Sequence, residues 1–168
     1  MLSSDLIRWG GLAAILAGVM SISDILFDVA VPDLLAVLLM VVGLLGLHAL
    51  QKNNYGRIGR VGLWTAVVAS LGQVLGIVVF WLGSEALIWL AYPVAYVAVP
   101  IGLLLYGAAT LQARMLPRWC GLGLIIIPPI TLILGDNYGS VLLGLLWLAL
   151  GYVLWSRRSV AADLLSRA

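Results

Sequence analysis

The chain has 168 residues, of which 64% are hydrophobic and 10% are charged, and its mean hydropathy is +1.16. A soluble fold cannot bury that much apolar surface, so the composition excludes a water-soluble globular protein and predicts a membrane protein. The formal net charge of +2 comes from nine cations spread among the loops, a pattern typical of membrane topology and not of nucleic-acid binding.

In chain order, six apolar stretches are long enough to cross a bilayer as helices. We expect them at about Ile7–Phe27, Leu34–Leu50, Val61–Leu82, Ala86–Leu111, Trp119–Leu134 and Ser140–Trp155. Gly, Pro, Asn and Asp mark the turns, at Pro32-Asp33, Asn53–Gly56, Gly83-Ser84 and Gly135–Gly139. Because every connection is short, the sequence predicts a single all-α transmembrane domain over residues 1–168, a six-helix bundle of three antiparallel hairpins.

The cations fall on one side of this arrangement. They are Arg8, Lys52, Arg57, Arg60, Arg114, Arg118, Arg157, Arg158 and Arg167, whereas the other connections carry Asp28, Asp33, Glu85 and Asp136. Since basic loops stay in the cytoplasm, the alternation predicts a multi-pass membrane protein with both termini cytoplasmic. The single cysteine, Cys120, lies on the same side and excludes an internal disulfide.

A weak internal repeat accompanies this topology. Similar segments open the odd-numbered spans: Arg8–Leu12, Arg60–Leu63 and Arg118–Leu122. Gly-Leu-Leu recurs in the even-numbered spans, from Gly43, Gly102 and Gly144. Each unit would be one up-and-down hairpin, although a Gly/Leu-rich composition also produces such matches by chance.

Polar side chains are few, and each has a structural interpretation beside a functional one. Gln73, near the middle of the third span, could bind a polar ligand group, but interhelical hydrogen bonding is the favoured interpretation. Asp24 and Asp28 share a helix face at the outer end of the first span. They could bind a cation, but a solvated helix end is the favoured interpretation.

Three further features are candidates for ligand binding. His48, near the cytoplasmic end of the second span, could bond a quinone oxygen, although an interfacial position explains it. Pro128-Pro129 breaks the fifth span, as substrate-lining helices do, but a simple kink is favoured. Tyr92 and Tyr96 share one face of the fourth span, where packing is the simpler reading.

Motifs for catalysis are missing from the sequence. It has no HExxH zinc motif, no phosphate-binding GxxxxGK[ST] loop and no CxxC pair, and its lone histidine and Ser84 are predicted a membrane apart. We therefore expect a protein that is not an enzyme and that carries no cofactor or metal of its own, although a bound lipid or quinone remains open.

Two segments carry a resemblance. Gly43–Gln51 followed by Gly56–Gly62, and Ala108–Trp119, resemble small uncharacterised bacterial six-span inner-membrane proteins. The resemblance implies a bacterial inner-membrane location and transfers no activity.

The smooth, apolar spans with small-residue patches favour a non-catalytic accessory or structural subunit of a larger membrane complex, such as a respiratory or photosynthetic electron-transfer complex. Its expected partners are membrane lipids and other membrane-protein subunits, without nucleic acid. The alternative is a small transporter or a lipid- or quinone-binding protein that uses Gln73, Pro128-Pro129, His48 or the Tyr92/Tyr96 face. A sensor acting through the tail from Arg157 to Ala168 ranks last.

Overall fold

The computed structural model describes residues 2–27, 30–51, 54, 56–83 and 85–166. Within these ranges every regular element is a helix: α1 (Leu2–Phe27), α2 (Ala30–Gln51), α3 (Arg57–Trp81), α4 (Glu85–Ala113) and α5 (Arg118–Ser166). Six segments are long and apolar enough to span a membrane, because α5 contains two, Arg118–Gly135 and Tyr138–Ser156. The predicted all-α fold with six spans is confirmed.

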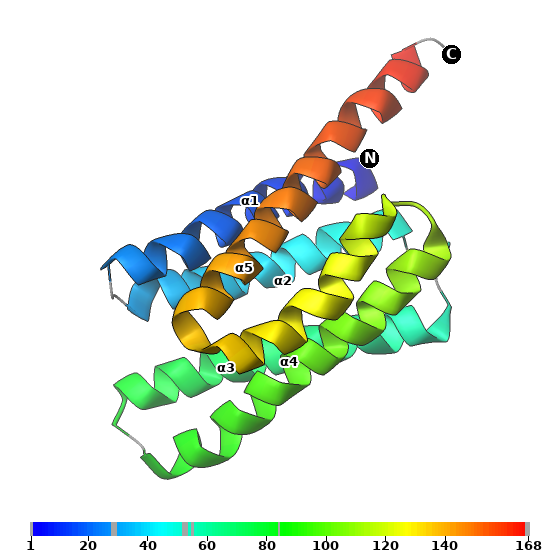
Figure 1. Cartoon of the computed structure of the whole chain (residues 1–168). Helices are drawn as coiled ribbons and strands as arrows, with labels where there is room; N and C mark the ends of the chain where they lie inside the picture. The colour runs from blue at the N-terminus through cyan, green and yellow to red at the C-terminus, as the bar shows by residue number, and fades with distance from the viewer. Residues whose placement is uncertain (1, 28–29, 52–53, 55, 84, 167–168) are drawn as a thin grey trace.

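The chain reverses inside α5 at one residue. Gly135 has φ 74° and ψ −178°, a conformation that is open almost exclusively to glycine. Figure 1 shows α5 running to this point and folding back beside itself. The predicted turn over Gly135–Gly139 is therefore too long, because a single glycine conformation makes the reversal and the helix resumes directly. We call the two parts the first and second spans of α5.

Other boundaries also differ from prediction. Helix α2 begins at Ala30, so Pro32 and Asp33 lie in its first turn and not in the preceding connection. Proline is tolerated there, because the amide groups of a first turn have no partner within the helix. Helix α5 continues past the predicted end at Trp155 to Ser166 and projects from the bundle (Figure 1). The predicted turn at Gly83 is confirmed, with φ 76°.

The helices form a closed arrangement. α1 packs on α2, and α3 packs on α4, as the predicted hairpins require. α5 then packs on α4 and also on α1, so the first and last spans are neighbours. The α1–α5 contact is close: a Cβ added to Gly18 would lie 2.5 Å from the Gly144 carbonyl oxygen, and one on Gly151 would lie 2.7 Å from the Gly11 oxygen.

The first two hairpins pack in the same register, which gives structural content to the sequence repeat. In the first hairpin Gly43 lies against Ala14, and in the second Gly102 lies against Ala66. The close approach of Gly10 to Gly46 likewise corresponds to that of Gly62 to Leu105. The third hairpin departs from this register, because Gly144 contacts Gly18 and Ile22 of α1 instead of its own partner span.

The core follows these contacts, and the outside is apolar. Trp147, Tyr106, Leu44 and Leu103 are among the largest fully buried side chains. Large hydrophobic side chains such as Val97, Ile101 and Ile133 are exposed, as expected of surfaces that meet lipid tails. Most of the exposed aromatic side chains lie near span ends, where amphipathic rings favour the headgroup region: Trp9, Trp81, Trp119, Tyr138, Tyr152 and Trp155. Trp64, 56% exposed, lies further along the span of α3.

Candidate functional site

Gln51 and Thr110 join α2 to α4 inside the bundle. Gln51 ends α2 and is 0% exposed, and Thr110, near the end of α4, is 2% exposed. The Thr110 hydroxyl donates to Gln51 Oε1 at 3.2 Å and to the Tyr106 carbonyl oxygen at 2.9 Å. Since a hydroxyl has one hydrogen, the two acceptors share it, and the interhelical bond is the longer of the two.

Some buried side-chain donors have no hydrogen-bond partner. Among the described side chains these include Gln51 Nε2 and Trp147 Nε1, together with the hydroxyl of Ser70. Trp147 lies in the second span of α5, and its ring packs against Gly43 of α2. Buried donors are normally paired, so these groups are places where a carbonyl or quinone oxygen would find a hydrogen bond.

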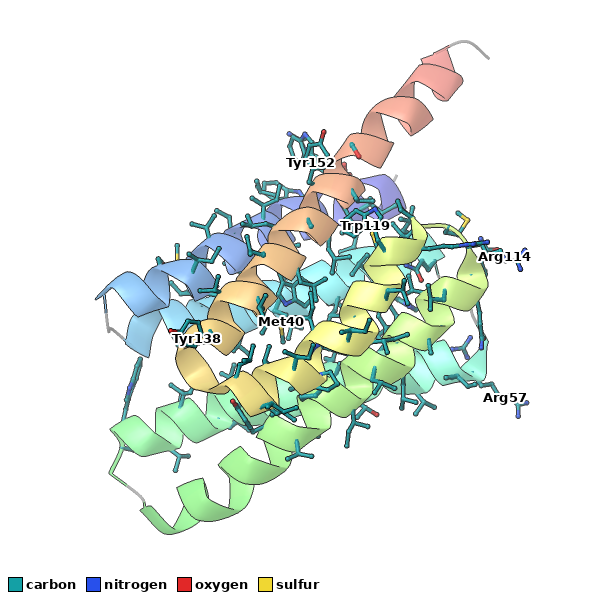
Figure 2. The ribbon with its side chains drawn as sticks, in the orientation of Figure 1. Met40, Arg57, Arg114, Trp119, Tyr138 and Tyr152 are labelled. Carbon is teal, nitrogen blue, oxygen red and sulfur yellow. The ribbon has the colours of Figure 1, made fainter. Side chains whose placement is uncertain are left out.

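His48 lies at the edge of this polar pair. It precedes Gln51 by three residues, which puts both on neighbouring positions of α2, and its side chain is half-buried. Figure 2 shows Met40, earlier on the same helix, inside the bundle, where its side chain is buried in the core. Along α2, the side chains that face the bundle are therefore apolar at Met40, and the polar Gln51 follows at the end of the helix, close to His48.

Gln73 and the tyrosines of α4 belong to the α3–α4 hairpin. Gln73 is half-buried on α3, and Tyr96 is half-buried on α4. The side chain of Tyr92 lies outside the described residues. Gly76, next to Gln73 along the helix face, is buried, so this part of α3 meets another helix closely. The setting suits interhelical hydrogen bonding by Gln73 and leaves the ligand hypothesis as a prediction.

The two prolines lie inside a continuous helix. Pro128 is fully buried and Pro129 is half-buried, and the first span of α5 remains helical through both. The Thr131 hydroxyl donates to the Pro128 carbonyl oxygen at 2.7 Å. The two prolines remove the backbone donors for the carbonyl oxygens of Leu124 and Ile125, so the Thr131 bond is an additional local contact and does not replace them.

The predicted acidic pair at the outer end of α1 is Asp24 and Asp28. The Asp24 side chain and the whole of Asp28 lie outside the described residues. Ser21, one turn earlier, donates to the Ala17 carbonyl oxygen at 3.0 Å. The cation-binding hypothesis for these carboxylates stays a prediction.

The structure thus brings together a pair that the sequence reading did not single out. Neither Gln51 nor Thr110 is among the candidate residues that the sequence predicts. The hydrogen-bonded pair is 59 residues apart. That separation is also the one between Gly43 and Gly102, so the repeat places Gln51 and Thr110 at equivalent positions of their helices, although equivalence alone does not predict contact.

Comparisons with known proteins add no assignment. No protein-family model matches the chain, and no curated protein or solved structure shows significant similarity to it. Within the described part of the chain, no group of three or more His, Cys, Asp or Glu side chains is placed to hold a metal ion.

Proposed function

We propose that the chain is a non-catalytic accessory subunit of a larger membrane assembly, with an electron-transfer complex as the first assembly to examine. The outer face of α3 carries this proposal. It exposes apolar side chains that alternate in spacings of three and four residues: Val61, Trp64, Val68, Leu71, Leu75 and Val78. Side chains at this spacing form the seam between packed helices.

The place of α3 in the bundle supports this proposal. Its extensive contacts within the described chain are with α4, and fewer are with α2. The seam is therefore turned away from the bundle, with exposed fractions up to 64% at Val68. A transmembrane helix of another subunit is the partner that such a seam fits.

The proposed location is a bacterial inner membrane with both termini in the cytoplasm. The support is electrostatic, because the described arginines outside α5's C-terminal extension all flank spans at the same end of the bundle. Figure 2 shows two of them, Arg57 and Arg114, extending from that end.

The test is purification in a mild detergent followed by mass spectrometry of co-migrating proteins. We expect stoichiometric recovery of a larger complex with the parent chain. Val68→Trp should release it, because the larger ring obstructs a partner helix while remaining compatible with lipid. Ile101→Trp, on the 50% exposed outer face of α4, is the matched control and should retain the complex. Recovery of an isolated chain alone would contradict the proposal.

The buried donors favour one alternative, a small transporter or a lipid- or quinone-binding protein. Gln51 Nε2 and Trp147 Nε1 offer hydrogen bonds inside the bundle that no described protein group accepts. This alternative predicts that the purified chain retains a quinone or lipid in organic extracts. It also predicts that Gln51→Met abolishes retention, while Gln112→Met, on the exposed side of α4, does not.

A further inference from the structure

The connection between α4 and α5 presents two exposed arginines on an anchored backbone. It joins the span Tyr96–Ala113 to the span Arg118–Gly135, so it lies at the membrane surface. Arg114 and Arg118 are exposed, whereas Leu116 between them is only 6% exposed and packs into the core. The buried leucine therefore holds the connection against the bundle and leaves the two guanidinium groups outside.

The arginine at the end of α4 occupies an unusual position. Arg114 has φ 52°, the left-handed conformation that follows many helices and that glycine normally occupies. Among the described residues other than glycine, Arg114 is the one with a positive φ. An arginine at this position is not explained by backbone preference, so the charge of its side chain is what distinguishes it from the glycine expected there.

The start of α5 adds further groups that favour anions. The Pro117 carbonyl oxygen accepts the first helical bond, from Cys120 N at 3.0 Å, so Pro117 caps the helix without any side-chain oxygen. The amide groups of Arg118 and Trp119, which precede that bond, have no acceptor within the helix, as at any helix start. Trp119, 47% exposed beside Arg118, is suited to the headgroup region (Figure 2).

We propose that the α4–α5 connection binds the headgroup of an anionic phospholipid, with Arg114 and Arg118 contacting its phosphate and Trp119 lying beside its glycerol region. Guanidinium groups pair with phosphate oxygens through two parallel N–H bonds. No described acidic side chain lies in this connection to neutralise the pair. By contrast, Arg8 has Asp5 one turn away on α1. The proposal is independent of which protein partner covers α3.

The test counts the lipid that remains bound to the purified full-length chain by native mass spectrometry. The chain in detergent is titrated with dioleoyl phosphatidylglycerol or with zwitterionic dioleoyl phosphatidylcholine. We expect preferential binding of phosphatidylglycerol, weakened about fivefold by Arg114→Gly and again by Arg118→Gln, because each cation near an anionic surface contributes about 1 kcal/mol. Arg114→Gly suits the local backbone, so this variant should fold as well as the parent.

Two controls keep the outcome decisive. The pair Arg57→Gln with Arg60→Gln removes the same charge from the same end of the bundle, at the start of α3. It should leave phosphatidylglycerol binding within twofold of the parent. An equal loss of phosphatidylglycerol binding in this variant and in the variant that combines Arg114→Gly with Arg118→Gln would contradict a local site. It would indicate diffuse electrostatic attraction instead. Competition by millimolar inorganic phosphate would overturn the lipid as ligand and indicate a free-anion site.

Discussion

Gly10 of α1 and Gly46 of α2 face each other with no room for a side chain on either residue. A Cβ added to Gly46 would lie 2.6 Å from the Gly10 Cα. Without a hydrophobic driving force between helices in lipid, such backbone contact is a main source of packing energy. The separation of α1 and α2 is therefore determined by single residues.

We expect Gly46→Ala to lower the free energy of unfolding by about 1–3 kcal/mol, because the added methyl group pushes the two helices apart. Gly56→Ala is the control: a Cβ at Gly56 meets nothing within 4 Å, so stability should change by less than about 0.5 kcal/mol. Reversible unfolding in mixed micelles, followed by circular dichroism, measures both. Equal stability of the two variants would show that the helices can separate without cost.

We expect the two members of the Gln51–Thr110 pair to respond differently when each is replaced by an apolar residue. Thr110→Val removes the described hydrogen bond to Gln51 Oε1 and should cost about 0.5–1.5 kcal/mol. Gln51→Met loses the same bond, but it also removes a buried amide nitrogen without a described partner, and the Thr110 hydroxyl keeps the Tyr106 carbonyl oxygen as acceptor, so we expect unchanged or higher stability. A double-mutant cycle measures the coupling, and a large loss in Gln51→Met alone would indicate that its nitrogen does bind something.

The sequence could predict that these residues lie near helix ends, but not that they meet. Leu50-Gln51 reads as the end of an apolar span, and nothing in the local pattern states which face of α2 turns inward. The hydrophobic period is little help in a helix that is apolar all round. The sequence feature that relates the two residues is their equal spacing from Gly43 and Gly102. It gains weight once the packing of Gly43 on Ala14 and of Gly102 on Ala66 is known.

At the scale of elements, the reversal at Gly135 is what makes one continuous helical stretch into two spans. The space around it is open, since an added Cβ would meet nothing within 4 Å. Substitution there therefore tests the backbone conformation and not packing.

We expect Gly135→Ala to destabilise the bundle by about 1–3 kcal/mol, because L residues avoid a φ of 74° combined with a ψ of −178°. The neighbouring Leu134→Ala, at a 44% exposed position, controls for a change at the same membrane depth. Thermal unfolding of the purified chain measures the difference. A Gly135→Ala variant no less stable than Leu134→Ala would mean that the reversal has another accessible geometry.

The two prolines of α5 show what the local sequence does not determine about a helix. Two consecutive prolines suggested either a break or a kink, and the helix continues through them while Thr131 bonds the Pro128 oxygen. Local propensity does not specify this outcome, because the packing of the surrounding bundle can hold a proline-containing helix in one piece. In contrast, the number of spans followed directly from apolar length, because every backbone group in lipid must be paired within its own helix.

For the whole molecule, the contact between α1 and the second span of α5 closes the bundle. It depends on Gly11, Gly18, Gly144 and Gly151, in a chain that has nineteen glycines. A sequence in which small residues are so common does not reveal which of them face a distant span. The hairpins were predictable because short connections force neighbours together, whereas closure is a property of the assembled fold.

The orientation of the bundle across the membrane is expected to follow from its charges and not from its packing. If basic ends stay in the cytoplasm, Asn54, between α2 and α3, is inside, and Leu82, 78% exposed after α3, is outside. Cys120 is buried and is the single cysteine, so Cys120→Ala provides a background for labelling. In intact cells a membrane-impermeant maleimide should label Leu82→Cys and leave Asn54→Cys unlabelled until the membrane is opened. Labelling of Asn54→Cys in intact cells would reverse the orientation and, with it, place the α4–α5 connection and its two arginines on the outer surface.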